Sequence, residues 1–211
     1  MVKERYQETF RSWNKVAQLY QDKFMDLELY NESYDWLLAA LVKRDASILE
    51  LGCGPGNISK YLLGKNPALL IKGIDISENM IGLARKNNPL AHFEVMDIRK
   101  LGQLNTSFDA IVGGFCIPYC SEQDVKKLIE NCRSLLLPNG LLYLSFVAGD
   151  YQKSGFIAGS TGDRSYFYYH EEEVIKAQLI AAGFTVLHRI YKKYRKSETQ
   201  VEEHTILITK C

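Results

Sequence analysis

The sequence predicts an α/β fold: a doubly wound, mostly parallel seven-stranded sheet with a C-terminal antiparallel hairpin and an N-terminal helical cap. From residue 45 onward, short apolar runs alternate with amphipathic stretches, as in repeated strand–helix units. A glycine-rich stretch, ELGCGPGN at residues 50–57, joins the first apolar run to a helical pattern. The last two apolar runs lie close enough in sequence to form a hairpin, which would place an antiparallel strand in the sheet.

The N-terminal segment is expected to form the helical cap. Residues 8–43 read as helical, because Phe10, Trp13 and Tyr20 recur at three- and four-residue spacing. A chain of 211 residues suits one domain. We therefore interpret residues 1–44 as a cap that belongs to the same domain as residues 45–211.

The remaining elements follow in order along the chain. Helices are expected at 57–64, at 78–87, after the capping signature SEQD at 121–124, and at 171–184. The glycine-rich residues 149–165 read as a long loop. Seven runs are predicted as strands: 47–51, 69–76, 92–98, 108–116, 141–147, 185–194 and 202–210.

Composition and charge disfavour several partners. The formal net charge is +1, so no global field attracts nucleic acid or a membrane surface. The five cysteines form no CxxC pair and no zinc spacing, so we expect reduced thiols and no metal site. No apolar run reaches the roughly 18 residues of a membrane span, and the first residues lack a secretory signal pattern. These observations predict a cytoplasmic protein.

Gly52, Gly54 and Gly56 lie where the first strand turns into a helix. In an open parallel sheet, ligands bind outside the carboxyl ends of the strands, and this turn holds the free N–H groups of a helix N-terminus. A dinucleotide or S-adenosylmethionine fits such a turn. The dinucleotide fingerprint is G-x-G-x-x-G, whereas the third glycine here comes one residue early. Glu50 would repel a pyrophosphate but attract the ammonium and sulfonium groups of S-adenosylmethionine.

Two further acids end the next two strands. Asp75 is placed to accept hydrogen bonds from both hydroxyls of a ribose, a feature that also fits NAD. Asp97 is placed to accept from an adenine amino group, with the Ile98 N–H meeting a ring nitrogen. Four apolar side chains are expected to sandwich the base: Ile76, Met80, Met96 and Ile98.

The motifs ELGCGPGN, GIDIS, VMDI, FDAIVGGF and LPNGLLYLS, in this order, resemble those of class I S-adenosylmethionine-dependent methyltransferases. The resemblance runs from about residue 45 to the C-terminus. It implies a Rossmann-like sheet whose last two strands form a hairpin. It also implies an enzyme that transfers a methyl group from S-adenosyl-L-methionine to a small molecule, with S-adenosyl-L-homocysteine as the second product.

The resemblance further implies roles for single residues. Asp75 would hold the ribose, and Asp97 the adenine. Gly113 and Phe115, at the end of the fourth strand, would pass close to the sulfonium. Tyr20 resembles the N-terminal tyrosine that closes over the cofactor's carboxylate in relatives, although the cap could instead be mere core cover. The methionine end would lie beside Glu50, Gly52, Cys53, Gly54 and Gly56, with Cys53 as a small packed residue.

The methyl acceptor is expected to lie between the N-terminal helix, residues 113–120 and residues 149–170. The segment CIPY at 116–119 resembles the [DNS]-P-P-[YF] motif of enzymes that methylate amino groups of bases or glutamine. Its register relative to the fourth strand is wrong for that role. We therefore expect a small-molecule acceptor rather than nucleic acid.

Two residues are candidates for acceptor contact or for a general base: Tyr119 and His170. His170 could instead simply lie at the start of a helix. His92, His188 and His204 are interpreted as surface or strand-face residues.

Other functions remain open at this stage. The chain could be a non-catalytic S-adenosylmethionine-binding or regulatory protein, or a nicotinamide-dependent oxidoreductase. The early third glycine and Glu50 argue against the oxidoreductase. The sequence leaves open whether the protein is a monomer or a homodimer, and it does not identify the acceptor.

Overall fold

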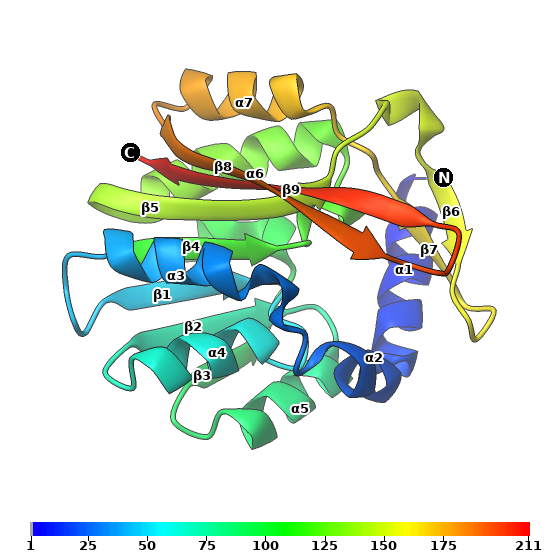
Figure 1. The fold of residues 1–211 in the computed structure, drawn as a ribbon, viewed down its shortest axis with the longest axis horizontal. Helices are drawn as coiled ribbons and strands as arrows, with labels where there is room; N and C mark the ends of the chain where they lie inside the picture. Colours follow the sequence, from blue (N-terminus) through cyan, green and yellow to red (C-terminus); the bar gives the residue numbers. More distant parts are fainter. Residues whose placement is uncertain (1) are drawn as a thin grey trace.

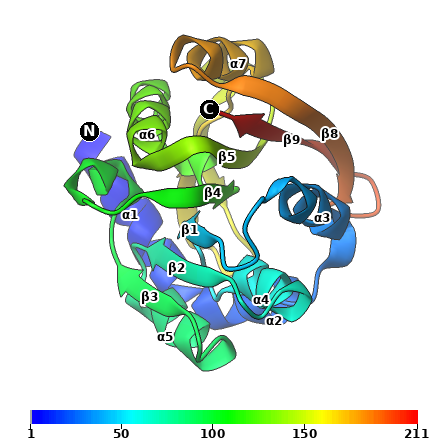
Figure 2. The ribbon, with the colours of Figure 1, turned by 90° about the vertical axis from the view of Figure 1, so that its left-hand side faces the viewer.

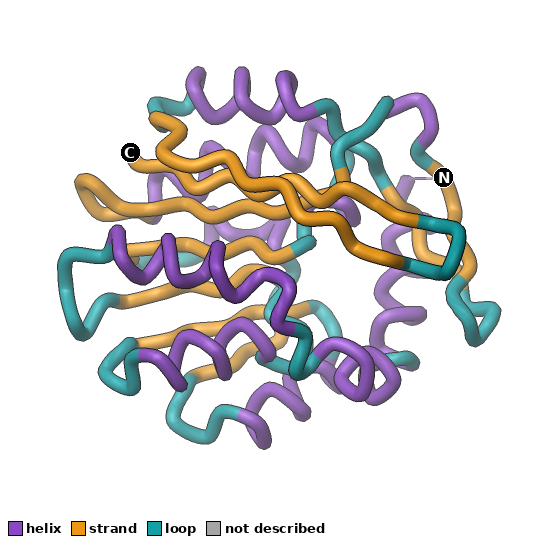
Figure 3. Tube along the Cα trace, viewed as in Figure 1, coloured by secondary structure: helices purple, strands orange, loops and turns teal. Residues whose placement is uncertain are grey.

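The computed structural model describes residues 2–211, which build a seven-stranded sheet in the order β3-β2-β1-β4-β5-β9-β8 (Figures 1 and 3). Neighbouring strands from β3 to β5 are parallel, whereas β9 is antiparallel to both β5 and β8. The predicted fold class is thus confirmed. The strands are β1 Ser47–Leu51, β2 Leu70–Asp75, β3 His92–Val95, β4 Phe108–Gly114, β5 Leu136–Val147, β8 Thr185–Arg195 and β9 Val201–Lys210.

Helices cover both faces of this sheet (Figure 2). Successive strand residues point to opposite faces, so Leu49 packs with α6 and α7 while Ile48 packs with α3 and α4. The central strands are therefore apolar on both sides, as the continuous apolar runs predict. The covering helices are α3 Asn31–Ala40, α4 Asn57–Lys65, α5 Glu78–Asn87, α6 Glu122–Leu135 and α7 Glu172–Ala181, with the short turns η2 Ile98–Gln103 and η3 Ile117–Tyr119.

The first two helices of the N-terminal segment lie across the carboxyl ends of the strands, whereas its last helix, α3, lies on one face of the sheet (Figure 1). The segment is not one continuous helix but breaks into α1, α2, the turn η1 and α3. Side chains tie it to α5, since Ser77 Oγ donates to Asn14 Oδ1 at 2.8 Å and Asn87 Nδ2 donates to Gln21 Oε1 at 2.7 Å. The division at residue 44 stays a prediction. The bounds are α1 Val2–Lys15, α2 Ala17–Phe24 and η1 Glu28–Tyr30.

The prediction of a long loop at residues 149–165 is wrong, because this segment after β5 folds into a turn and most of a two-stranded hairpin. This hairpin packs on α1, where Ser12 Oγ donates to the Arg164 carbonyl at 2.5 Å and the Tyr166 N–H donates to Thr9 Oγ1 at 2.9 Å. An isolated two-stranded hairpin is marginal, so this packing supplies what its glycine-rich sequence lacks. The elements are η4 Tyr151–Lys153, β6 Gly155–Ala158 and β7 Arg164–Phe167.

Among the described helices, none combines the length and apolar character needed to cross a membrane.

Candidate active site

A cavity of about 340 Å³ opens at the carboxyl ends of the central strands. Its floor is the turn after β1, where Gly54 lies, and Asp75 at the end of β2. Trp13 from α1 and Tyr20 from α2 form a wall, and Phe115, directly after β4, forms another. The cavity therefore lies where an open parallel sheet binds its ligands.

The glycines of the turn adopt left-handed backbone conformations. Gly52 has φ +61° and Gly54 has φ +54°, values that side-chain-bearing residues rarely adopt. A Cβ on Gly54 would lie 3.6 Å from the Tyr20 ring. The backbone of this turn is thus exposed to the cavity and faces an aromatic side chain on the opposite wall.

Glu50 is a buried acid in the cavity floor, only 1% exposed. The hydroxyl of Ser59 on α4 donates to Glu50 Oε2. Burial raises the pKa of Glu50 to about 8, and the nearby Asp75 charge adds to the rise, whereas the Ser59 hydrogen bonds oppose it. A pKa of about 8 favours the protonated form of Glu50 at pH 7.

Asp75 is held at the end of β2 by two backbone groups. The Gly54 N–H donates to Asp75 Oδ2 at 2.9 Å, and the Ser77 N–H donates to Oδ1 at 2.8 Å. Burial raises the pKa of Asp75, while these hydrogen bonds oppose the rise. Each oxygen keeps a further lone pair, so the carboxylate can accept two more hydrogen bonds from a ligand.

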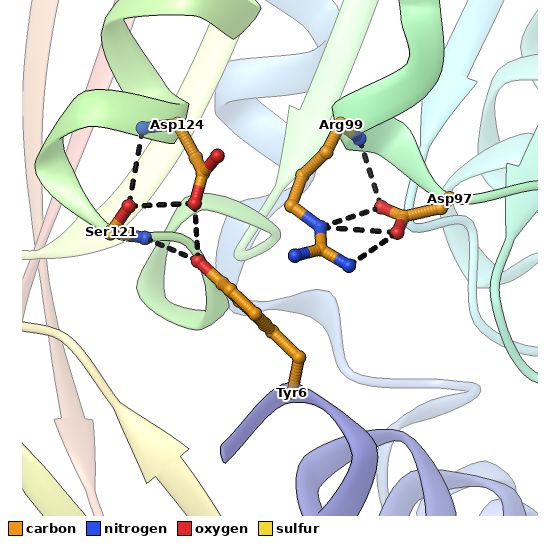
Figure 4. A network of polar contacts seen from close by, with 5 residues as sticks. All are labelled: Tyr6, Asp97, Arg99, Ser121 and Asp124. Atoms are coloured by element: carbon orange, nitrogen blue, oxygen red, sulfur yellow. Dashed lines mark hydrogen bonds and ion pairs between the residues drawn. The ribbon is translucent and has the colours of Figure 1, made fainter. Parts of the chain in front are cut away.

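Asp97, after β3, is clamped by Arg99. The guanidinium donates to both carboxylate oxygens, with Nε–Oδ1 at 3.0 Å and Nη2–Oδ2 at 2.5 Å. Arg99 also lies over the Tyr6 ring of α1, 3.8 Å from its centroid. The Tyr6 hydroxyl donates to Asp124 Oδ2 at 2.5 Å and accepts from the Ser121 N–H at 3.0 Å (Figure 4). This network joins α1 to the β3 side of the cavity.

Most of the other predicted residues also line the cavity. On the β2–β3 side these are Ile76, Met80 and Ile98, and near the glycine turn it is Cys53. Tyr119 lies against the Trp13 ring edge to face, with centroids 5.3 Å apart. The structure thus brings polar and apolar candidates from four strands to one cavity. Their roles in binding stay predictions.

Three predicted cofactor residues lie outside the cavity lining. Met96 packs against the core beside α6. Gly113 faces the Leu144 side chain, because alternation along β4 directs its neighbour Gly114 to the cavity instead. Gly56 caps α4, where an added Cβ would clash with the side chain of Asn88, directly after α5.

His170 also lies outside the cavity lining. Its ring is 1% exposed, and Nε2 donates to the Ile117 carbonyl at 3.0 Å. Burial lowers the pKa of His170, so the ring stays neutral. Its position ties the segment after β7 to η3, and it gives no support to a role as general base.

A group of polar residues on the β8–β9 hairpin lines the cavity although the sequence did not single them out. Glu202 and His204 on β9 face it together with Lys196. His204 is a strand-face residue, as interpreted, but this face is buried, and the side chain is 6% exposed. Period-two spacing of Glu202 and His204 was a signal in the sequence. Nothing in the sequence indicated that this hairpin extends over the cavity. Within residues 2–211, no three His, Cys, Asp or Glu side chains are grouped to hold a metal ion.

Known proteins share this sequence pattern and this fold. A family model described as a methyltransferase domain matches residues 48–140. The malonyl-[acyl-carrier protein] O-methyltransferase of Enterobacter lignolyticus is 28% identical over 124 residues, which cover 58% of this chain and 48% of that protein. The tRNA N(3)-methylcytidine methyltransferase trm140 of Schizosaccharomyces pombe is 36% identical over 147 residues, covering 63% and 47%. The chain thus spans about half the length of these curated relatives.

A solved structure covers the whole chain. The 1,6-didemethyltoxoflavin-N1-methyltransferase of Burkholderia thailandensis, solved with 1,6-didemethyltoxoflavin and S-adenosylhomocysteine, superimposes with a TM-score of 0.72. The alignment covers 100% of this chain and 90% of that one at 16% identity. The fold is therefore the Rossmann-like fold of class I methyltransferases. This fold and the matched domain at residues 48–140 agree with the resemblance of the sequence motifs to class I S-adenosylmethionine-dependent methyltransferases.

Proposed function

We propose that this protein binds S-adenosylmethionine in the cavity and transfers its methyl group to a small-molecule acceptor. One observation carries the proposal. A buried acid, Glu50, and a second acid, Asp75, converge with the left-handed glycine turn on one cavity. Two acids at these places suit a ligand that joins a cationic group to a ribose.

The residues present fit the cofactor chemically. Within the described part of the chain, the hydrogen-bond partner of the Glu50 carboxyl is the Ser59 hydroxyl and not a cation, so an ammonium or sulfonium would find an acid without a positive neighbour. The free lone pairs of Asp75 suit two ribose hydroxyls, and Ile76, Met80 and Ile98 form an apolar surface for the adenine. Asp97 is already positioned by its Arg99 clamp and keeps acceptor capacity for an amino group.

Methyl transfer requires the protein chiefly to position the methyl donor and the acceptor. When bound, the cofactor would supply a methyl group carried on a sulfonium sulfur, which is a good leaving group. The protein's own contribution is to orient the two reactants and to exclude water, which is worth roughly 7–11 kcal/mol of the barrier. The aromatic walls formed by Trp13, Phe115 and Tyr119 suit this exclusion.

The acceptor side supports a small molecule. The cavity lies under α1 and α2 and is lined there by aromatic side chains, including Trp13, Tyr119 and Phe167. A net charge of +1 offers no general attraction for a polyanion. We further propose a single domain and a cytoplasmic location, as the sequence predicts.

The test is formation of S-adenosylhomocysteine from S-adenosylmethionine and a fractionated metabolite extract, followed by mass spectrometry. We expect turnover with the wild type and with the exposed control variant Glu130→Gln, and its loss in Asp75→Ala. Binding without turnover in any fraction would favour a non-catalytic binding protein. Binding of NADH in place of S-adenosylmethionine would favour an oxidoreductase and contradict the proposal.

A further inference from the structure

The end of the β8–β9 hairpin extends past the other strands, toward α1 and α2 (Figure 1). Pairing along this hairpin sets Tyr194 opposite Glu202 and Lys192 opposite His204. The side chains of Tyr194, Glu202 and His204 line the cavity. The hairpin therefore brings ionisable groups to the cavity from the edge opposite Asp97.

The side chains of Glu202 and His204 form a continuous row with Tyr30 of η1 and Lys196. The Tyr30 hydroxyl lies 2.7 Å from His204 Nδ1. On the other side of the ring, His204 Nε2 lies 3.6 Å from Glu202 Oε2. Glu202 Oε1 in turn accepts from Lys196 Nζ at 2.8 Å. Tyr30, His204, Glu202 and Lys196 all line the cavity.

The protonation states of Tyr30 and His204 set the direction in which a proton can move along this row of side chains. Burial raises the pKa of Tyr30, so its hydroxyl keeps its proton and donates it to Nδ1. Burial lowers the pKa of His204, so the ring is neutral and carries its proton on Nε2, toward Glu202. A neutral imidazole bonded to a phenol and flanked by a carboxylate is the arrangement of a general base.

The other groups facing His204 preserve this arrangement. Tyr194 stacks on the ring, with centroids 5.3 Å apart. Lys192, opposite His204 on β8, pairs with Glu32, and its ammonium lies close to that carboxylate at 2.5 Å. Lys196 lowers the pKa of His204 through its charge, whereas its partner Glu202 opposes that effect.

Phe115 lies between the cofactor side of the cavity and the side chains of Tyr30 and His204. Its φ of +53° is unusual for an aromatic residue, and its N–H is fixed by Ser145 Oγ at 3.0 Å. The ring packs edge to face on His204 at 4.7 Å and lies 5.3 Å from the Tyr30 ring. Strained backbone of this kind concentrates at functional sites. With Trp13, these rings form walls that suit a flat aromatic molecule.

We propose that Tyr30, His204 and Glu202 form a proton relay that ionises an aromatic methyl acceptor carrying an acidic O–H or ring N–H. The inference rests on the proposed function. The acceptor's X–H bond breaks and its electron pair stays on X, while the proton passes to the Tyr30 oxygen. Tyr30's own proton moves to His204 Nδ1, and Glu202 pairs with the imidazolium. The proton then leaves His204 for water.

The experiment uses 4-nitrophenol as probe, because its phenolate absorbs visible light and its neutral form does not. The protein is first saturated with S-adenosylhomocysteine, and that binding is measured by calorimetry. The ionisation of bound 4-nitrophenol is then followed by absorbance against pH. We expect His204→Gln to raise the apparent pKa of the bound probe by about one unit, a tenfold change in ionisation. The exposed-histidine control His92→Gln should leave it unchanged.

Further variants keep the test informative if His204→Gln does not fold. Glu202→Gln removes only the charge and should also raise the probe's pKa, and it should lower the pKa of His204 measured by NMR on histidine-labelled protein. Tyr30→Phe should break the relay likewise. Equal probe ionisation in wild type and all three variants, or no binding of the probe to the S-adenosylhomocysteine complex, would overturn the inference. Failure of S-adenosylhomocysteine to bind would instead contradict the proposed function.

Discussion

Glu50→Gln tests whether the buried acid in the cavity floor recognises a cation. The side chain is 1% exposed and bonded to Ser59, and glutamine keeps nearly the same shape and an oxygen that can accept that hydrogen bond. Burial moves the pKa of Glu50 from 4.5 to about 8, which corresponds to ~5 kcal/mol of differential interaction between its two protonation states. At pH 7 this shift favours the uncharged acid.

The sign of the pH dependence follows from this shift. The folded protein holds the Glu50 proton more tightly than the unfolded chain, so the group's contribution to stability is fully present below pH 4.5 and is lost as the pH rises toward 8. At pH 7 about nine-tenths of the Glu50 side chains carry a proton. If the bound ammonium and sulfonium ionise Glu50, binding must release about 0.9 of a proton at pH 7.

Calorimetry of S-adenosylmethionine binding in buffers of different ionisation enthalpy measures this release. We expect about 0.9 of a proton for wild type and for the exposed control Glu130→Gln, and nearly none for Glu50→Gln. The wild-type affinity should rise about tenfold from pH 6 to pH 7, whereas the affinity of Glu50→Gln should stay flat. Equal proton release in wild type and Glu50→Gln would refute the reasoning.

Three further predictions concern stability, each measured by urea denaturation. Gly56→Ala should cost about 2 kcal/mol or more, because its φ of +80° disfavours alanine and the new Cβ would meet Asn88; an unchanged midpoint would contradict the cap geometry. Phe115→Gly should be more stable than Phe115→Ala by about 1 kcal/mol, because glycine adopts the left-handed backbone conformation of this residue without the strain that alanine would have. Tyr6→Phe should lose about 1.5–3 kcal/mol because a hydrogen bond to the Asp124 carboxylate is removed; a loss below 0.5 kcal/mol would show that this bond does not hold α1 in place.

The sheet was predictable because its strands carry local signals. Alternating apolar runs and the glycine turn indicate strand–helix units, and parallel strands bring Glu50 and Asp75 to one edge whatever the details of packing. The hairpin β6–β7 was missed, since its stability comes from contacts of Ser12 and Thr9 on α1, far away in sequence. The strand propensity of a segment does not include contacts with residues far away in sequence, so it could not predict this hairpin.

The acceptor side was less predictable for the same reason. Tyr30 and His204 are separated by 174 positions, and only the folded hairpin brings them within hydrogen-bond distance. His170 was an attractive candidate by residue type, yet a single residue type does not reveal which way a ring points, and its Nε2 faces the Ile117 carbonyl. Strand alternation does predict that Gly114 rather than Gly113 faces the cavity, once one residue of β4 is placed.

The central claim is that the acid-lined cavity binds the sulfonium cofactor, and a crystal structure with S-adenosylmethionine or its homocysteine product tests it most directly. The account predicts ribose hydroxyls within hydrogen-bond distance of Asp75 and the amino group directed toward Glu50. A cavity that stays empty at saturating ligand, or that takes up a pyrophosphate-containing nucleotide instead, would contradict it.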